Sequence, residues 1–401
     1  MAHQPPILII GAGVAGLVLA QGLRLRSIAF RLFERHPRSH ISQGHRFRIS
    51  KKGQLALNSV LSPQLQLLFR ETAAEKYCFE PRYVDATKLD YPDLTPVEPE
   101  NMPLDRTWIR QLLSVNLDDT IEYGKSFESY EVVDGHINAK FTDGSIIRGQ
   151  LLVGADGIRS CVRKQLQPGR KLLNLERWIM WGRTPLTARL KDSLPPDLLT
   201  WCMYLDHEAN VQTVVEPIVW PKSVQVSEHK LTDFYDYVYW CLCAAPRQYA
   251  EDLPKTPEEK RQYLQKISNT WHPDLKLLIN SAALEPATLE LSACIPVLSS
   301  KPHIEIGSTG QTGRITLIGD AAHSMSPMGG SGADTAIRNA ADLAQTIAEG
   351  ITEKSIAGFE SRMETRAKEK IEHSFRGGQK FWRGKEWTEY SEIDVLASTY
   401  A

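Results

Sequence analysis

The sequence has little of what marks secreted, zinc-binding, membrane-spanning or nucleic-acid-binding proteins. Its 401 residues include six cysteines, and no two of them form a C-x-x-C pair, so neither a disulfide framework nor a zinc site is indicated. The most apolar later stretch, residues 237–245, is nine residues long, whereas a membrane-spanning helix needs about 18. The net charge of −1 excludes a whole-protein attraction to nucleic acid or anionic membranes.

The amino-terminal segment lacks the marks of a signal peptide. Residues 1–6 contain no lysine or arginine, and the apolar run that follows stops at Gly11. We therefore expect a cytoplasmic protein with no membrane span and no nucleic-acid partner. Hydrophobic residues make up 42% of the chain and charged residues 24%, which are ordinary values for a globular protein. At about 150 residues per domain, the length suggests two or three domains.

The first 34 residues show a strand, a helix and a second strand in succession. Residues 7–10 are a continuous apolar run closed by glycines, which is typical of a strand buried on both faces. Residues 14–26 have helical composition, and residues 28–33 again read as a strand. This βαβ unit predicts a parallel sheet. Two Asp-Gly pairs, at residues 134–135 and 143–144, predict an antiparallel meander beside it.

The first motif is the glycine pattern between that strand and helix. Gly11 permits a tight turn, Gly13 lets the backbone approach a pyrophosphate, and Gly16 lets the helix pack closely on the strand. Glu34 ends the second strand, close to the distance of about 20 residues expected for a carboxylate that binds a ribose hydroxyl. The alternative is a glycine-rich turn without a ligand. The motif alone does not distinguish NAD from FAD.

Two further strands end in Gly-Asp segments. The apolar residues 151–153 lead into Gly154-Ala-Asp156-Gly157, which by itself could be a simple turn. Residues 315–318 lead into Gly319-Asp320, and a proline- and glycine-rich loop then precedes a helix start at Gly332. Backbone amides around Gly332 would face an anionic edge of a ligand.

In this order and spacing the three segments resemble the dinucleotide-binding, DG and GD motifs of the FAD-dependent aromatic hydroxylases (class A flavoprotein monooxygenases), closest in look to fungal secondary-metabolism members. Residues 181–186 are similar to the segment that opens the substrate domain in the fungal proteins. The resemblance implies an α/β fold: a Rossmann-like FAD-binding domain of the GR2 type, para-hydroxybenzoate-hydroxylase-like, with a second, mixed-sheet substrate domain and C-terminal helices. We expect the FAD-binding domain in residues 1–72, 104–176 and 296–350, the substrate-binding domain in 73–103 and 177–295, and a C-terminal helical segment in 351–401.

The resemblance also implies which residues bind the cofactor. Arg48, in the segment from His45 to Arg48, resembles the arginine that touches FAD, and Arg106 resembles the arginine that begins a helix beside the flavin phosphates. Asp320 would accept a hydrogen bond from a ribityl hydroxyl. The full predicted set for FAD is Gly11, Gly13, Val14, Ala15, Gly16, Glu34, Arg35, Arg48, Arg106, Asp156, Asp320, Gly332 and Ala333, and no metal site is expected.

Two residues depart from the family pattern, and the catalytic residues are not identified. Asp334 stands where such proteins often have asparagine, and Asn339 stands where an aspartate often follows. Asp334 would alter flavin redox behaviour if it faced the ring, or would otherwise serve the amino end of its helix. His323 is expected to be structural. The catalytic residues remain unknown, with Arg183 and His207 as the weak candidates.

The implied activity is that of an FAD-dependent monooxygenase. NADPH or NADH would reduce the flavin as a transient co-substrate, and O2 would form a flavin C4a-hydroperoxide that transfers one oxygen atom to an aromatic or polycyclic small molecule, a secondary metabolite. No obligatory reductase is expected. The alternatives are a flavin-dependent oxidase or redox-neutral flavoprotein, a flavin halogenase, whose W-x-W-x-I-P signature is missing, and a non-catalytic GDI-like carrier related to prenyl-protein chaperones.

Overall fold

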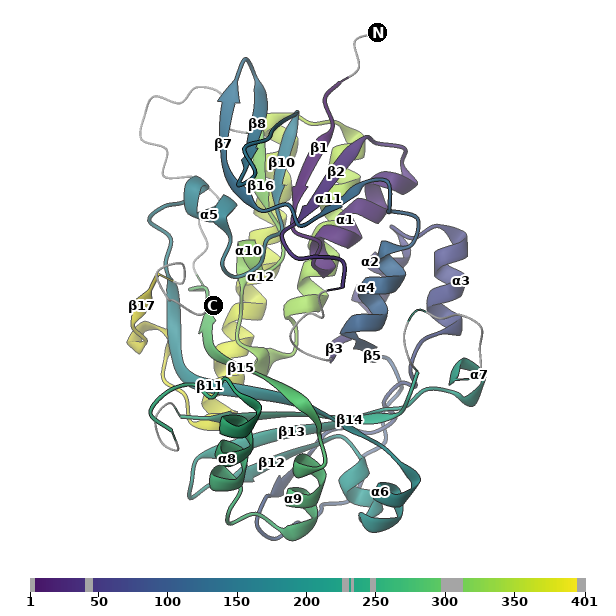
Figure 1. Cartoon of the computed structure of the whole chain (residues 1–401), viewed down its shortest axis with the longest axis vertical. Coiled ribbons are helices and arrows are strands. Elements are labelled where there is room, and N and C mark those ends of the chain that lie inside the picture. Colours follow the sequence, from purple (N-terminus) through teal and green to yellow (C-terminus); the bar gives the residue numbers. More distant parts are fainter. Residues whose placement is uncertain are drawn as a thin grey trace.

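The computed structural model describes residues 4–39, 46–225, 231, 234–245, 250–296 and 313–394. Two main sheets dominate it, a parallel sheet in one half of the molecule and a larger mixed sheet in the other (Figure 1). The predicted α/β class, with a Rossmann-like unit and a second mixed-sheet unit, is confirmed. Among the described residues, no helix is both long and apolar enough to cross a membrane.

The parallel sheet has the strand order β16-β10-β1-β2-β6. Every residue of the first strand is buried, as the apolar run at residues 7–10 predicts. Two helices, α1 and α11, pack against each other beside this sheet. The elements are β1 (Ile7–Ile10), α1 (Val14–Leu25), β2 (Phe30–Glu34), α4 (Arg106–Ser114), β6 (Ile121–Tyr123), β10 (Leu151–Gly154), β16 (Ile315–Leu317) and α11 (Gly332–Glu349).

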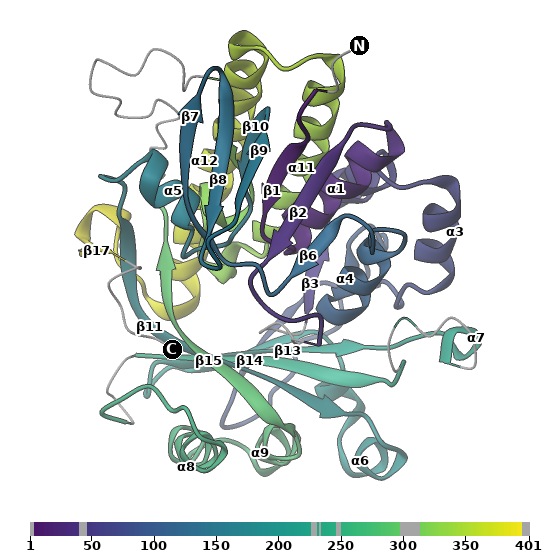
Figure 2. The same ribbon diagram turned by 45° about the horizontal axis from the view of Figure 1, so that its top comes forward.

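An antiparallel meander lies beside the parallel sheet (Figure 2). Its first turn places Asp134 and Gly135 both at positive φ, which is the backbone geometry that the predicted Asp-Gly hairpin requires. The predicted meander is thus confirmed. Its strands are β7 (Phe127–Val133), β8 (His136–Phe141) and β9 (Ile146–Gly149).

The larger sheet has the order β15-β11-β14-β13-β12-β4, and β17 pairs with β11. It is mixed, because β4 is parallel to β12 while the other pairs are antiparallel. The strands are β4 (Arg82–Asp85), β11 (Leu172–Pro185), β12 (Cys202–Asp206), β13 (Val211–Ile218), β14 (Tyr237–Ala244), β15 (Ala283–Ala293) and β17 (Glu392–Ile393).

The two faces of the larger sheet pack against different partners. On one face, which we call the outer face, Trp240 and Leu242 join a core formed with helices α8 (Pro257–Ile267) and α9 (Pro273–Asn280). On the inner face, Tyr239 and Cys241 join a core with α12 (Glu353–Trp382). This alternation along β14 is the period-two pattern of a strand buried on both sides.

Helix α12 connects the two halves of the molecule (Figure 1). Its first part, with Phe359 and Met363, belongs to the core of the parallel sheet, whereas Ile371 and Phe375 belong to the core on the inner face of the larger sheet. The sequence predicts helices from Gly332 onward, and α11 and α12 confirm them. The remaining elements include β3 (Arg46–Ile49), α2 (Lys51–Asn58), α3 (Pro63–Glu71), β5 (Met102–Asp105), α5 (Cys161–Leu166), α6 (Ala188–Ser193), α7 (Lys222–Gln225) and α10 (Asp320–His323).

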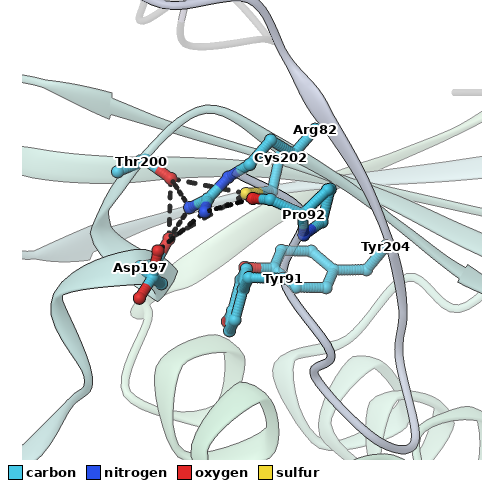
Figure 3. Close-up of polar contacts among 7 residues, drawn as sticks. All are labelled: Arg82, Tyr91, Pro92, Asp197, Thr200, Cys202 and Tyr204. Carbon is cyan, nitrogen blue, oxygen red and sulfur yellow. Dashed lines mark hydrogen bonds and ion pairs between the residues drawn. The ribbon is translucent and has the colours of Figure 1, made fainter. Parts of the chain in front are cut away.

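A buried arginine fixes the edge strand β4 to the loops around it (Figure 3). The Arg82 guanidinium donates hydrogen bonds to the Asp197 carboxylate at 2.7 Å, the Asp197 carbonyl at 3.1 Å, the Thr200 hydroxyl at 2.7 Å and the Pro92 carbonyl at 3.1 Å. It also lies 4.8 Å from the centre of the Tyr91 ring. Because Val84, two residues along the strand, belongs to the outer core, Arg82 stabilises the outer side of the sheet.

The predicted domain boundaries remain a prediction. Strand β11 belongs to the larger sheet from Leu172 onward, which is ahead of the predicted boundary at residue 177. Residues 297–312 and 395–401 of the predicted domains lie outside the described residues.

Candidate functional site

The three glycine-containing motifs meet at one edge of the parallel sheet. Strand β10 pairs with β1 on one side and β16 on the other, all in parallel, so the loops after these strands are neighbours. The contacts are close: a Cβ added to Gly11 would lie 2.5 Å from the Ala155 carbonyl oxygen, and one added to Gly319 would lie 2.9 Å from the Ala15 Cβ. The tertiary structure thus brings together segments separated by more than a hundred residues.

The glycines of the first motif have different roles. Gly11 has a φ of +106° and no room for a side chain, and a Cβ on Gly16 would lie 2.0 Å from the Gly11 carbonyl oxygen. Both positions therefore require glycine for packing. Gly13 has no described heavy atom within 4 Å of its added Cβ, so the space in front of it is open. The protein's own packing therefore does not require glycine at this position, whereas the close approach of a ligand would.

The amino ends of α1 and α11 at this edge differ from most other helix starts in the described structure. Helices α1 and α11, which begin with Val14-Ala15 and with Gly332-Ala333, have no side-chain cap, and neither does the short α10. By contrast, a side chain caps the amino end of α2, α3, α4, α5, α6, α8, α9 and α12. Uncapped amino ends present free backbone N–H groups and a partial positive charge, which is the arrangement that binds anions.

Glu34 stands at the end of β2 beside the first glycine turn. Its carboxylate accepts hydrogen bonds from the backbone N–H of Ala12 at 2.8 Å and of His36 at 3.0 Å. Each oxygen keeps a further lone pair, so the carboxylate can also accept from a hydroxyl. The next residue, Arg35, donates to the His36 ring at 3.2 Å on the surface.

The two aspartates of the later motifs are placed differently. The Asp156 carboxylate binds within its own loop, accepting from the Ser160 hydroxyl and, at 2.8 Å, from the Cys161 N–H. It therefore orders the start of α5. Asp320 is exposed at the start of α10, which leaves its carboxylate accessible.

Arg106 is the first residue of α4 and lies near Asp320. Burial lowers the pKa of its guanidinium, while the charge of Asp320 raises it. The helix begins where predicted, because Asp105 caps it by accepting from the Trp108 N–H at 2.9 Å. A cation thus stands close to the uncapped helix ends of this edge.

Arg48 lies in a buried cluster between the two main sheets, which the sequence alone did not predict. Its guanidinium lies 3.9 Å from the centre of the Trp201 ring, and that of Arg46 lies 4.7 Å from the centre of the Tyr239 ring. Glu216 forms ion pairs with both arginines and is fully buried on β13. The sequence does contain one sign of this cluster, a single glutamate inside the apolar run of residues 214–220. A carboxylate buried in such a run requires a charged partner.

Arg183 and His207 are not brought together. Arg183, near the end of β11, donates to the Asp105 carboxylate at 2.7 Å and lies over the Tyr237 ring at 4.1 Å. The guanidinium is thus held by the protein itself. His207 is exposed in the turn between β12 and β13, at the opposite end of these strands.

The two departures from the family pattern both have partners within the protein. The Asp334 carboxylate accepts from the backbone N–H of Ser50 at 2.8 Å and from its hydroxyl at 2.9 Å, so it ties α11 to the start of α2. Asn339 lies 2.9 Å from Nε2 of His323, which is fully buried. This environment agrees with the structural role predicted for the histidine. His45 lies outside the described residues.

Comparison with known proteins shows similarity to FAD-dependent monooxygenases. A family described as "FAD binding domain" matches residues 305–371, which contain the third motif and α11. The chain is 27% identical over 458 residues to the dual O-methyltransferase/FAD-dependent monooxygenase elcB of Phaeosphaeria nodorum, covering 97% of this chain and 47% of that protein. It is 25% identical to the FAD-dependent monooxygenase adaC of Aspergillus niger, covering 97% of this chain and 96% of that protein.

Solved structures show the same relationship. A protein of Photorhabdus luminescens described as an FAD-containing monooxygenase is 27% identical, with a TM-score of 0.81 over 95% of this chain and 99% of that one. Among the curated relatives, by contrast, the first three are much longer proteins, and this chain spans about half the length of each. The predicted resemblance and the predicted fold are confirmed, and FAD is the cofactor that they support.

Proposed function

We propose that this chain, a relative of the FAD-dependent monooxygenases of the aromatic hydroxylase type, is itself such an enzyme, using NAD(P)H and O2 to insert one oxygen atom into an aromatic or polycyclic small molecule. The observation that carries the proposal is the uncapped amino ends of α1 and α11 at one edge of the parallel sheet, with open space at Gly13. A cofactor with a diphosphate and an anionic ring edge matches two such ends. The cytoplasmic location stays a prediction.

The residues at this edge fit FAD in charge and in hydrogen-bonding capacity. The amino end of α1 and Arg106 would hold the diphosphate, Glu34 a ribose hydroxyl and Asp320 a ribityl hydroxyl. The first N–H groups of α11, at Gly332 and Ala333, would face the ring edge. These assignments are those that the resemblance implies, and the donors, acceptors and open space described above support them. Bound FAD would supply the redox chemistry and the activation of O2.

The proposed substrate site is the inner face of the larger sheet, opposite these loops. Tyr237 and Tyr239 are on that face, and Trp201 lies over Arg48 nearby. Aromatic side chains that line a site bind planar apolar molecules. These features favour an aromatic or polycyclic substrate. Because the first curated relatives are about twice as long, the activity of the whole protein is also part of this proposal.

The visible spectrum of the purified protein, before and after anaerobic addition of NADPH, tests the proposal. We expect a flavin absorption band that bleaches when NADPH is added. When a substrate is turned over under ¹⁸O2, we expect the product to carry one labelled oxygen atom. A flavin band that never bleaches with NADPH, together with a product that carries no label, would indicate an oxidase or a redox-neutral flavoprotein. A protein that takes up no FAD even on reconstitution would contradict the proposal and favour a non-catalytic carrier.

A further inference from the structure

The buried cluster of Arg46, Arg48 and Glu216 has no role in the proposed function so far. The two arginines are alternate residues of β3, so their side chains leave the strand on the same side. The β3–β5 ribbon lies between the two main sheets (Figure 1). Glu216 comes from the other side, on the inner face of the larger sheet, where it is paired in register with Tyr239. The cluster therefore bridges the cofactor unit and the substrate sheet.

The charges in this cluster do not cancel. Among the residues that the structure describes, two guanidinium groups face one carboxylate, so one positive charge remains in this largely buried cluster. The nearby Asp105 carboxylate does not neutralise it, because it accepts from Arg183 and Tyr237. Burial and the neighbouring Arg46 lower the pKa of Arg48 to about 9, which is the effect of an incompletely compensated buried cation.

The excess charge lies beside the third motif. A Cβ added to Gly330, which has a φ of +58°, would lie 2.9 Å from Nη2 of Arg48. Gly330 is two residues before Gly332, where the uncapped helix α11 begins. Arg48 thus reaches from β3 to the loop that would face the ring edge of the cofactor. The carboxylate of Glu216 lies 3.6 Å from Nε of the same guanidinium.

Stability alone does not explain a carboxylate at position 216. A buried ion pair seldom contributes more free energy of folding than an apolar side chain of similar volume, because both charges lose their hydration. The carboxylate does fix the position of two long, flexible side chains, and it cancels one of their charges.

We propose that Glu216 is a positioning residue that holds Arg46 and Arg48 beside the loop that would face the flavin ring, and that it limits the net positive charge of this cluster to one unit. This inference rests on the proposed function. With Glu216→Gln the cluster carries two positive charges, which favours the anionic reduced flavin over the neutral oxidised one. With Arg46→Met the cluster carries no net charge, because Arg48 and Glu216 cancel each other. This change favours the neutral oxidised flavin.

The midpoint potential of bound FAD, measured by equilibration with a reference dye, tests this. One unit charge at about 10 Å, in a medium of effective dielectric about 20, would change the ratio of reduced to oxidised flavin by about tenfold. For a two-electron couple, this ratio corresponds to a change of about 30 mV in the midpoint potential. We expect Glu216→Gln to raise the potential and Arg46→Met to lower it. The matched control is Glu290→Gln, a carboxylate on the outer side of the same sheet that accepts from the Trp178 indole at 3.3 Å, and it should leave the potential unchanged.

The outcomes separate this inference from the proposed function. A wild-type protein that binds no FAD would overturn both. FAD binding with no shift in either variant, or with shifts of the same sign, would overturn the role of Glu216 alone. If Glu216→Gln does not fold, the sign of the Arg46→Met shift decides, because a purely structural cluster predicts no particular sign.

Discussion

The Asp105 carboxylate accepts hydrogen bonds from Arg183 and from the Tyr237 hydroxyl through the same oxygen, each at 2.7 Å. Its other oxygen caps α4, the helix that begins with Arg106. One buried carboxylate therefore connects the proposed diphosphate-binding helix to strands β11 and β14 of the larger sheet. The contact assigns Arg183, a weak candidate for catalysis on the sequence alone, to the joint between the two units.

We expect Asp105→Asn to lower the free energy of unfolding by about 3 kcal/mol, because it leaves the largely buried Arg183 cation without its counter-charge. Urea unfolding of the FAD-free protein measures the loss. The double variant Asp105→Asn/Arg183→Met should lose less than the sum of the two single variants, since it removes both charges. Additive losses would show that the two side chains do not interact.

Substitutions of the first-motif glycines should separate folding from cofactor binding. Gly13→Ala has open space and a φ of −72°, so we expect normal stability and FAD affinity reduced about tenfold or more. Gly11→Ala should be destabilised, because its Cβ would lie 2.5 Å from a backbone oxygen. Gly169→Ala, also with no described atom within 4 Å, is the control and should change neither quantity. Full FAD affinity in Gly13→Ala would argue against a diphosphate at this turn.

Loss of the Arg82 side chain should affect stability and leave FAD affinity unchanged. Arg82→Met removes four hydrogen bonds on the outer side of the sheet, and we expect a cost of about 2–3 kcal/mol. The control is Arg31→Met, which breaks a half-exposed ion pair with Glu122 and should cost less than about 1 kcal/mol. Equal losses in the two variants, measured by chemical unfolding, would contradict this assignment.

Acidification should destabilise the protein through His323. Burial lowers the pKa of this histidine to about 4, below the value of 6.5 for an exposed imidazole. Its contribution is fully present above pH 6.5 and is lost as the pH falls toward 4, up to about 3 kcal/mol. Unfolding measurements at pH 5 and pH 7.5 in a Glu360→Gln background test this, and adding His323→Gln should remove the loss of stability on acidification.

A second titratable group, Glu360, changes the stability with pH in the opposite direction. It must be removed by substitution before the effect of His323 can be measured clearly. Burial raises the pKa of Glu360 to about 7, above 4.5, so its contribution is fully present below pH 4.5 and is lost as the pH rises through 7. In Glu360→Gln the stability should therefore fall more steeply on acidification than in the wild type. A slope unaffected by this substitution would show that Glu360 does not titrate in this range.

The parallel βαβ unit, the three motif loops and the helix starts at Arg106 and Gly332 could all be predicted from the order of amino acids. The helix start at Arg106 is implied by the resemblance to the aromatic hydroxylases, whereas the other features depend on local rules: an apolar run of four residues, and glycines where the backbone turns or packs closely. Such rules act over a few neighbouring residues, and so no knowledge of the rest of the fold is needed to apply them.

Which charged side chains meet could not be predicted in this way, because their partners are distant in the sequence. Glu216 and Arg46 lie on strands of different sheets, and Arg183 and Asp105 are likewise joined across the two halves of the molecule. Asp334 binds Ser50, which neither sequence-based expectation for that residue included. A buried charge requires a partner, but the sequence does not specify which one. The choice depends on how two separately folded surfaces pack against each other, and that packing is set by the whole core.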